Sequence, residues 1–503
     1  MAEAVPATRL RRVNSAPLRP ERDHVLYWMV AARRVRSNFA LDRAVELSRE
    51  LGKPLLVFEA LRCGYRWAND RLHAFVLQGM ADNAARCAAK GVAYLPYVEP
   101  EPDHGKGLLA ALAARACAVV TDDWPCFFVP RMVETAGRML DVRLEAVDGN
   151  GMLPLAAQGR AFGRAFDLRR FLQKHLPDHL GRAPRKDSLS PLHDMPRAVI
   201  PRAVTSRWKP ASTAQLAASA AALAALPIDH TVAPSRRLHG GSTTAHAQLS
   251  RFLRDGFSRY AVERSHPDAD AQSGLSPWLH FGHIGVHEVF DAVTHHDDWS
   301  AARISSAVTG SNTGWWGGSA NLESFLDELI TWRELGFGMC HHAPRDYDRY
   351  ESLPAWARAS LELHESDPRP QLYTIDELAD GRTDDPLWNA AQNELRRDGR
   401  MQNYLRMLWG KRVLEWTPTA RDAAAVLVEL NNRFAIDGRD PNSYSGIFWC
   451  LGRYDRPWAP ERPVFGVIRY MSSANTRRKL KLTRYLACHG GAEAPMLPGF
   501  ADT

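Results

Sequence analysis

The sequence predicts a Rossmann-like α/β domain with a doubly wound parallel sheet, followed by a large all-α domain. Three observations support this fold class. The chain has 503 residues, 45% of them hydrophobic, which is enough material for two or three domains. In the first third of the chain, short apolar runs alternate with longer amphipathic segments, as in strands joined by helices. Beyond residue 241 the apolar residues recur at helical spacing almost to the end.

Five short apolar runs in the first part are expected to form the sheet. They cover residues 25–30, 54–58, 92–95, 118–120 and 144–147. Parallel strands are buried on both faces, so they read as unbroken apolar runs. Ligands of such sheets lie outside the carboxyl ends of the strands, here near residues 33–38, 122–124 and 148–150. Since no glycine-rich phosphate-binding fingerprint follows a strand, a dinucleotide in this domain is not supported.

Changes in composition divide the chain into four predicted parts. The first 23 residues are rich in arginine and proline and have no apolar period, which is typical of a disordered basic arm. Proline breaks and an alanine run follow the predicted sheet and indicate a connection that contains helices. The predicted parts are a disordered arm (1–23), an α/β domain (24–155), an interdomain linker with helices (156–240) and an α-helical domain (241–503).

Composition also limits the class of protein. The seven cysteines are scattered without a CxxC pair, which argues against zinc ribbons, iron–sulfur clusters and disulfides and fits a reducing cytoplasm. The longest apolar run, residues 108–120, is too short to cross a membrane. No metal is expected, because His280, His283 and His287 lack a supporting carboxylate pattern. The net charge of +7 permits a nucleic-acid partner without requiring one. We expect a cytoplasmic protein, monomeric and not bound to a membrane.

A serine- and glycine-containing stretch precedes a predicted helix start. Ser273, Gly274, Leu275 and Ser276 stand directly before Pro277. Free backbone N–H groups at such a start favour a phosphate group. Capping of the helix by Ser276, with proline in the first turn, explains the same pattern equally well.

Two pairs of residues have helical spacing that suits chemistry. Glu328 and Trp332 are four residues apart, so on a helix they share a face, where an indole can stack on a base and a carboxylate can meet a polar edge. Trp409 and Trp416 are seven residues apart, about 10.5 Å along a helix axis, which suits electron hopping. For both pairs the alternative is ordinary packing of an amphipathic helix.

The second half of the chain is rich in tryptophan. Most of the fifteen tryptophans follow residue 278, and several stand beside arginines, a combination that nucleic-acid sites use. Core packing explains most of them equally well. The tract 309–318, which contains Trp315 and Trp316, is expected to be a flexible loop tip or an element that faces DNA.

Several long motifs of the second half resemble the flavin-binding core of class II DNA photolyases, the cyclobutane pyrimidine dimer enzymes of the photolyase/cryptochrome family. The resemblance is dense between about residues 275 and 470 and continues more weakly back to residue 25. The motifs are DDPLWNAAQ (384–392), GRMQNYLRMLWGK (399–411), LNNR (430–433), DGRDPNSY (437–444) and ERPVFGVIRYM (461–471).

This resemblance implies an FAD site, a DNA site and an electron relay. Trp388 is expected nearest the flavin, with the other two relay tryptophans further out in either order. Asn442 is the alternative to Asn431 at the flavin N5 region, and the α/β domain is expected to hold an antenna pigment of the deazaflavin or folate type. The implied FAD-binding residues are Tyr260, Ser273, Gly274, Leu275, Ser276, Arg406, Asn431 and Asp437; the DNA-binding residues are Glu328, Trp332, Trp449, Arg456, Trp458 and Arg469; the catalytic residues are Trp388, Trp409, Trp416, Asn431 and Glu328.

The implied function is light-driven repair of UV-damaged DNA by a deoxyribodipyrimidine photolyase. Reduced FAD would donate an electron to a flipped-out cyclobutane dimer. The alternatives are a cryptochrome-like flavin photoreceptor, a photolyase with a preference for 6-4 photoproducts or single strands, and a DNA-binding protein without flavin. The presence of Glu328, Trp332 and the arginine-rich segment favours repair.

Overall fold

Six strands form a single sheet in the order β1-β6-β5-β2-β3-β4. The computed structural model describes residues 4–491. All neighbouring strands are parallel except β1, which runs antiparallel to β6. The predicted doubly wound α/β fold is therefore confirmed. The strands are β1 (Leu10–Arg12), β2 (His24–Met29), β3 (Leu55–Leu61), β4 (Ala93–Val98), β5 (Ala116–Asp122) and β6 (Leu144–Val147).

The strand order reverses between β2 and β5, because the chain builds outward through β3 and β4 and then crosses back. Asp122, the last residue of β5, holds this point together. Its Oδ2 accepts hydrogen bonds from the N–H groups of Val30, Ala31 and Ala32 at 2.8–3.0 Å, and its Oδ1 accepts one from the Tyr27 hydroxyl at 2.8 Å. The loop after β2 is therefore fixed at the edge of the sheet where doubly wound folds bind ligands.

Helices cover both faces of the sheet, and their ends follow local capping rules. Asn38 begins α1 by accepting hydrogen bonds from the N–H groups of Ala40 and Leu41, and Gly52 ends it in the left-handed region at φ +62°. Asn69 caps α2 in the same way through the N–H of Leu72. The helices of this domain are α1 (Phe39–Leu51), α2 (Asp70–Ala89), α3 (Leu108–Ala113) and α4 (Val129–Met139).

The predicted disordered arm is wrong for residues 4–23. This segment contributes edge strand β1, and the side chain of Arg9 is only 2% exposed. Arg9 donates hydrogen bonds to the carbonyl oxygens of Asp148, Gly151 and Met152 and lies over the Phe39 ring at 4.5 Å. Five donors on one planar group can satisfy several buried carbonyl groups, and composition does not reveal such a role for an arginine. Residues 1–3 lie outside the described part of the chain.

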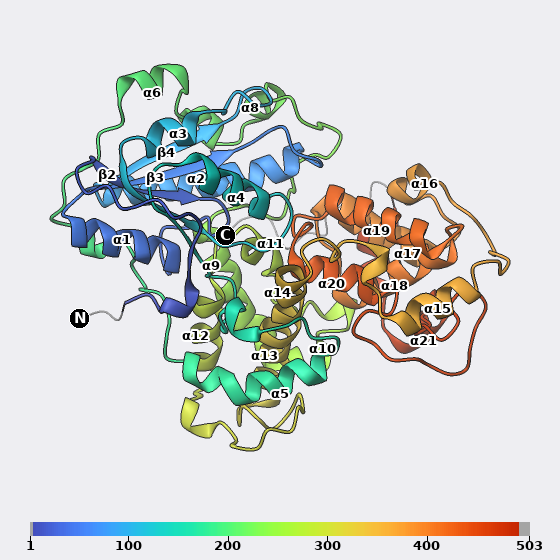
Figure 1. Ribbon diagram of the computed structural model, residues 1–503. Helices are drawn as coiled ribbons and strands as arrows, with labels where there is room; N and C mark the ends of the chain where they lie inside the picture. The colour runs from blue at the N-terminus through green and yellow to red at the C-terminus, as the bar shows by residue number, and fades with distance from the viewer. Residues whose placement is uncertain (1–3, 492–503) are drawn as a thin grey trace.

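The connection between the two domains contains helices and packs on both of them. Figure 1 shows α5 (Ala165–His175) beneath the helical domain, close to α13 and far from the sheet. The chain then returns to the α/β domain, where α6 (Arg202–Arg207) lies against α3, and α7 (Thr213–Leu216) and α8 (Ala220–Ala224) lie against α2. Helices of the connection thus contact both domains.

The second half of the chain is helical, as predicted. Two of its segments are π-helices, Phe252–Gly256 and Asp327–Trp332. No helix among residues 4–491 combines the length and the apolar character needed to cross a membrane. The α-helices are α9 (Ser242–Arg251), α10 (Tyr260–Glu263), α11 (Ser276–His280), α12 (Val286–His296), α13 (Ala320–Leu326), α14 (Arg333–His342), α15 (Ala355–Leu363), α16 (Ile375–Asp380), α17 (Pro386–Asp398), α18 (Asn403–Glu415), α19 (Ala420–Phe434), α20 (Pro441–Trp449), α21 (Ser473–Lys479) and α22 (Thr483–His489).

The two adjacent tryptophans of the tract 309–318 do not lie at an exposed loop tip, although residues 311–314 of the same tract are exposed. Trp315 and Trp316 are only 5% and 8% exposed and belong to the core of the helical domain. Their backbone is pinned as well, because Glu323 accepts hydrogen bonds from Gly314 and Gly317 and the Trp299 indole donates to the Trp316 carbonyl. The glycines let the backbone turn, and the two rings anchor it.

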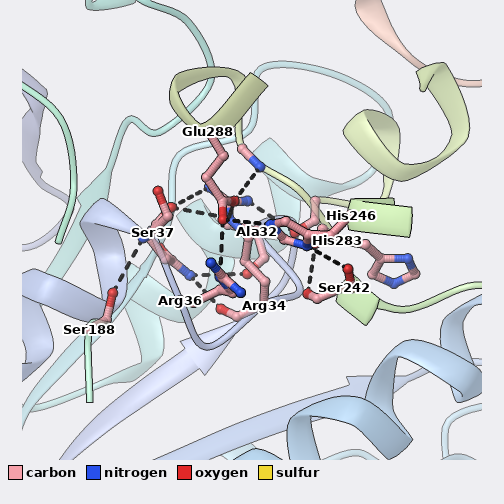
Figure 2. A network of polar contacts seen from close by, with 12 residues as sticks. Ala32, Arg34, Arg36, Ser37, Ser188, Ser242, His246, His283 and Glu288 are labelled. Carbon is pink, nitrogen blue, oxygen red and sulfur yellow. Dashed lines mark hydrogen bonds and ion pairs between the residues drawn. The ribbon is translucent and has the colours of Figure 1, made fainter. Parts of the chain in front are cut away.

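A buried polar network joins the α/β domain to the helical domain (Figure 2). Arg34 and Arg36, from the loop after β2, reach Glu288 on α12 at 3.6 and 3.1 Å. His246 on α9 lies 3.1 Å from the same carboxylate. Burial alone would raise the pKa of Glu288, but the hydrogen bond from His246 and the charge of Arg34 hold that pKa below its ordinary value. Glu288 is therefore ionised and links three segments from two domains.

Replacing the Glu288 carboxylate should lower the stability of the folded protein. We expect Glu288→Gln to lower the free energy of unfolding by about 3 kcal/mol, because it leaves buried Arg34 without its charge partner. Since the folded-state pKa of Glu288 is lowered, its contribution is present above the ordinary pKa and is lost as the pH falls through the lowered value. Urea titration at neutral and acidic pH measures both effects.

Glu50→Gln is the matched control. Its side chain is 61% exposed and reaches Arg43 only at 3.8 Å, so the change should cost about 0.5 kcal/mol or less. Equal losses in the two variants would show that the Glu288 network contributes nothing beyond an ordinary surface charge.

Candidate active site

One cavity of the helical domain brings together most of the residues that the sequence singled out. Its volume is about 550 Å³, within the range of cofactor sites. We call it the central cavity. The residues that border it include Tyr260, Ser273, Gly274, Leu275, Ser276, Glu328, Trp332, Arg406, Asp437, Asn442 and Trp449.

One wall of the central cavity is the π-helix Asp327–Trp332, which carries Glu328 and Trp332. Single π-turns widen a helix and recur at functional sites. Asp327 fixes this turn from outside, since it accepts two hydrogen bonds from Arg169 of α5 at 2.6 and 3.0 Å. The unusual turn is thus held by a buried ion pair from the connection between the domains.

Arg264 is a residue of this wall that sequence reasoning missed. Its guanidinium forms an ion pair with Glu328 and lies over the Tyr260 ring at 5.7 Å. Burial raises the pKa of Glu328, and the Arg264 charge opposes that rise. The available signal was its position four residues after Tyr260, on the same side of the chain. The wall therefore presents an indole and a carboxylate–guanidinium pair.

The opposite wall contains the predicted pair of Arg406 and Asp437. The guanidinium of Arg406, on α18, reaches the two carboxylate oxygens of Asp437 at 3.3 and 3.5 Å. Burial would raise the pKa of Asp437, but the Arg406 charge and a hydrogen bond from Ser276 bring it below its ordinary value. Asp437 is held in a tight turn, because a Cβ on the next residue, Gly438, would lie 2.8 Å from a backbone oxygen.

The serine- and glycine-containing stretch borders the cavity, and its serine does not cap the helix. Helix α11 begins at Ser276 without any side-chain cap, so the capping interpretation is wrong and the hydroxyl is free to meet Asp437. Gly274 adopts φ +64°, which glycine tolerates, and Gln248 donates a hydrogen bond to the Ser273 carbonyl at 2.6 Å. The backbone of this stretch is therefore fixed at the cavity edge.

Asn431 lies one layer behind the cavity wall. Its side chain is buried, and its amide donates a hydrogen bond to the Ser443 hydroxyl at 2.6 Å. Ser443 and the neighbouring Asn442 border the cavity themselves. Of the two asparagines considered from the sequence, the cavity wall therefore includes Asn442, while Asn431 supports the wall.

The three predicted relay tryptophans are stacked in an order that the sequence did not give. Trp388 lies 6.3 Å from Trp409, with nearly parallel rings, and 5.4 Å from Trp416, so it is the middle ring and not an end. All three rings are almost fully buried. Trp409 follows Arg406 by three residues on α18, and Trp416 meets half-buried Tyr373 at 5.2 Å. A continuous aromatic chain thus runs from beside the cavity wall to Tyr373.

Cations and rings alternate outward from the cavity along the arginine-rich segment. Trp449 borders the cavity, and Arg469 lies 5.7 Å from its ring. Arg469 also lies 4.6 Å from the ring of Trp458. The guanidinium of Arg456 lies 4.3 Å from the same ring. Arg456 and Arg469 are exposed. The predicted DNA-binding residues Arg456, Trp458 and Arg469 therefore do not line the cavity; they form a connected surface next to it.

A histidine clamp holds this segment in place. His364, at the end of α15, lies 2.6 Å from Asp367 and 3.1 Å from Glu461. Asp367 also accepts a hydrogen bond from the N–H of Val464 at 2.8 Å. The hydrogen bonds with Glu461 and then Asp367 raise the pKa of His364. Protonated His364 therefore ties residues 461–464 to α15.

This clamp predicts a pH-dependent loop. Because the pKa of His364 is raised, its contribution is full below the ordinary histidine pKa and is lost as the pH rises through the raised value. We expect the amides of residues 461–466 to exchange hydrogen more slowly at about pH 6 than at about pH 8, after correction for intrinsic rates. In His364→Ala the difference should vanish, whereas exposed His193→Ala should keep it. A pH difference that persists in His364→Ala would contradict the clamp.

A second cavity, of about 370 Å³, lies at the carboxyl ends of the strands, where the sequence placed a ligand. We call it the sheet-edge cavity. Arg33 and Glu99 border it, and His280 separates it from the central cavity, since it hydrogen-bonds at 3.2 Å to Asp440, which borders the other side. The aromatic residues of its lining are Trp28, Phe58, Tyr65, Tyr97, Trp124, Phe127, Phe128 and Phe281.

The three histidines considered as metal ligands have separate surroundings. His280 meets Asp440, His283 accepts a hydrogen bond from the N–H of Gly241 at 3.0 Å, and His287 packs edge-on against Phe39. Among residues 4–491 no group of three or more histidine, cysteine, aspartate or glutamate side chains is arranged to hold a metal ion.

Comparison with known proteins identifies the family. The chain is 32% identical over 486 residues to a deoxyribodipyrimidine photo-lyase of Methanothermobacter thermautotrophicus, covering 95% of this chain and 97% of that protein. It belongs to the photolyase/cryptochrome family. Proteins with the same name from Potorous tridactylus and Arabidopsis thaliana are each 30% identical, covering 92% and 95% of this chain and 80% and 91% of theirs. This confirms the predicted kinship with the deoxyribodipyrimidine photolyase enzymes. No protein-family profile matches the chain.

Solved structures of this family share the fold. A bacterial class III photolyase from Agrobacterium tumefaciens superimposes with a TM-score of 0.63 at 14% identity, covering 92% of this chain and 93% of the other. A cryptochrome from Synechocystis gives 0.62 at 14% identity, covering 92% and 88%. Photolyases and cryptochromes thus have the same architecture as this chain, and the fold alone does not separate repair from signalling.

Proposed function

We propose that this chain is a class II DNA photolyase that uses light to repair cyclobutane pyrimidine dimers. The observation that carries the proposal is the central cavity, where Glu328, Arg264 and Trp332 face the same space as the Arg406–Asp437 pair. One side suits a pyrimidine dimer, and the other suits a flavin. The photo-lyase name of relatives that match almost the whole chain supports the same activity.

The dimer would be held by stacking and by hydrogen bonds to its polar edges. Trp332 and Trp449 supply flat apolar surfaces, and a pyrimidine dimer, whose two rings are joined at an angle, needs surfaces on two sides. Glu328 accepts hydrogen bonds from ring N–H groups when it is ionised, and Arg264 donates to carbonyl oxygens. The ion pair between them keeps both groups oriented before DNA arrives.

The central cavity fits FAD in size and in charge. Its volume suits a cofactor, and its lining offers the backbone of the Ser273–Ser276 stretch to a phosphate group and Arg406 to a ring system. When bound, reduced FAD would supply the electron that splits the dimer and would take it back afterwards. Arg406 would favour a negatively charged ring system beside it, and Asp437 would keep that arginine in place.

The connected surface of Arg456, Trp458 and Arg469 would hold the opened duplex. Base flipping is the known route by which photolyases reach their target, and it leaves a gap in the base stack. Trp458, held between two arginines, has the shape to enter such a gap, and the arginines can neutralise the neighbouring phosphates. We infer that this connected surface faces duplex DNA next to the central cavity.

The sheet-edge cavity is proposed to hold an antenna pigment of the deazaflavin or folate type. Aromatic rings cover its walls, and charged side chains lie at its polar end. Only the pair of His280 and Asp440 separates it from the central cavity at this point, and such closeness suits transfer of excitation energy between two pigments.

Removing the carboxylate of the dimer wall should impair repair. We expect Glu328→Ala to lower affinity for dimer-containing DNA about 10- to 100-fold, since a charge-assisted hydrogen bond is lost and Arg264 is left unpaired. Flavin content should stay near the wild-type value. Repair of a dimer oligonucleotide under blue light, followed by chromatography of restored thymines, measures the effect, and Trp332→Ala should impair repair as well.

Glu263→Ala is the matched control for this experiment. Glu263 is a half-buried neighbour on α10 that pairs with Arg259 and does not border the cavity. It should repair dimers at the wild-type rate. Wild-type repair by both Glu328→Ala and Trp332→Ala would rule out this wall as the dimer site.

The aromatic chain predicts how oxidised flavin is reduced by light. Because Trp388 is the middle ring, Trp388→Phe should interrupt the chain and slow photoreduction at least about tenfold, while chemically reduced protein still repairs dimers. Absorbance at the flavin band under illumination measures the rate. Trp299→Phe, a ring outside the chain, should behave like the wild type. Undiminished photoreduction in Trp388→Phe would mean that electrons take another route.

A cryptochrome-like photoreceptor is the second candidate, because it shares the fold and can use the same aromatic chain. The pair of Glu328 and Arg264 favours repair, since a signalling flavin needs no base-binding wall. Light-induced photoreduction without any repair activity would favour the photoreceptor.

A further inference from the structure

Lys411 is a buried charged group that the proposed repair mechanism does not use. It lies on α18, two residues after Trp409, and its side chain is fully enclosed. Its ammonium donates a hydrogen bond to the Cys450 carbonyl at 2.6 Å. Among residues 4–491 no carboxylate lies within ion-pair distance of it. Enclosing an ammonium group without a counter-ion is costly, so the site calls for an explanation.

The ring of Trp449 stabilises the charge of Lys411, which has no carboxylate partner in the described part of the chain. The Lys411 ammonium lies 5.1 Å from the centre of this ring, within the range of a cation–π contact. Trp449 borders the central cavity, whereas Lys411 does not. The indole therefore lies between the buried charge and the space where the dimer is proposed to bind.

Lys411 is also the inner end of the alternating series of cations and rings. From Lys411 the series passes through Trp449 to Arg469 at 5.7 Å, and from Arg469 to Trp458 at 4.6 Å. Arg469 is exposed to solvent, whereas Lys411 is fully buried and is held by its hydrogen bond to the Cys450 carbonyl. The position and tilt of the Trp449 ring are therefore fixed from the buried side, and the outer rings are aligned from that fixed point.

We propose that Lys411 is a positioning residue for damage recognition: its charge fixes the Trp449 ring in the orientation that stacks on the lesion and thereby sets the preference for damaged over intact DNA. This inference rests on the proposed function. A purely structural role is the competing explanation, since the Cys450 carbonyl lies at the end of α20, where a cation stabilises a helix. The two explanations differ in what they predict for DNA binding in the dark.

The test compares two oligonucleotides in the dark, one with a single thymine dimer and one identical but undamaged. In Lys411→Met, whose side chain has similar length and no charge, we expect the ratio of the two affinities to fall about tenfold, as for a lost desolvated cation–π contact. Affinity for the undamaged oligonucleotide and flavin content should stay within about twofold of the wild type. An unchanged ratio in a folded, flavin-loaded variant would overturn the proposal.

Lys479→Met is the matched control. Lys479 lies on exposed α21 and also meets an aromatic ring, that of Tyr404 at 5.7 Å, but neither residue borders the central cavity. Loss of this surface charge should weaken binding of both oligonucleotides equally and leave their ratio unchanged. A fall in the ratio for Lys479→Met as large as for Lys411→Met would also overturn the proposal, because selectivity would then follow total charge.

A pH series on the wild-type protein keeps the proposal testable if Lys411→Met does not fold. Burial lowers the pKa of Lys411 to about 8, Cys450 and Asp455 oppose that shift, and Arg469 adds to it. The groups that face Lys411 are thus Cys450, Asp455 and Arg469, and burial raises the pKa of the Cys450 thiol to about 11. We expect the affinity ratio to fall reversibly as the pH rises through about 8, and a ratio that stays constant from about pH 7 to 9.5 would overturn the proposal.

The outcomes separate this inference from the proposed function. Wild-type protein that binds both oligonucleotides equally would contradict the proposed function, and the role of Lys411 would fall with it. Wild-type protein that prefers the dimer, together with a Lys411→Met variant that prefers it equally, would contradict the role of Lys411 alone.

Discussion

The ion pair between Arg406 and Asp437 connects most of the functional parts of this protein. Arg406 belongs to α18, the helix that also carries Trp409 and Lys411, and Asp437 belongs to the turn between α19 and α20. The pair therefore fixes the wall of the central cavity, one ring of the aromatic chain and the helix that ends at Trp449. A buried pair of this kind contributes more to geometry than to net stability, because desolvation offsets much of its attraction.

Other charged side chains also stabilise irregular backbone, such as the π-helix Asp327–Trp332 and the loop after β2. Arg169 fixes the π-helix through Asp327, and Glu288 ties the loop after β2 to α12. Irregular backbone can place side chains where a regular helix cannot, but it needs outside support. For the π-helix, the connection between the domains provides that support, since α5 packs against this helix and carries Arg169. Figure 1 shows α5 beside α13, the helix that precedes it.

Much of the fold could be predicted from the sequence, because buried parallel strands and amphipathic helices have strong local patterns. The cavity lining was also within reach, since long motifs with fixed spacing carried the resemblance. Two features were out of reach for physical reasons. Arg9 looks like part of a disordered arm until its carbonyl partners, about 140 residues away in the sequence, are known. Trp315 and Trp316 stand among glycines and polar residues, as in an exposed loop, and only the tertiary structure shows that both rings are buried in the core of the helical domain.

The order of the tryptophans shows the limit of spacing arguments. Trp409 and Trp416 are seven residues apart on one predicted helix, which suggested that they are consecutive members of a chain; in the structure Trp416 is the residue after the end of α18. In the structure Trp388, from the neighbouring helix α17, lies against both of them. Contacts between helices depend on how the helices cross, and one sequence does not specify that crossing. The pair of Arg264 and Glu328 was missed for the same reason, because its two residues come from separate helices.

The most direct test of this account is light-driven repair by the purified protein. An oligonucleotide with one cyclobutane thymine dimer is incubated with chemically reduced, FAD-loaded protein, under blue light and in the dark, and restored thymines are quantified. The account predicts restoration in the light and none in the dark. No restoration in the light, from protein that binds FAD and reduces it under illumination, would contradict repair as the function.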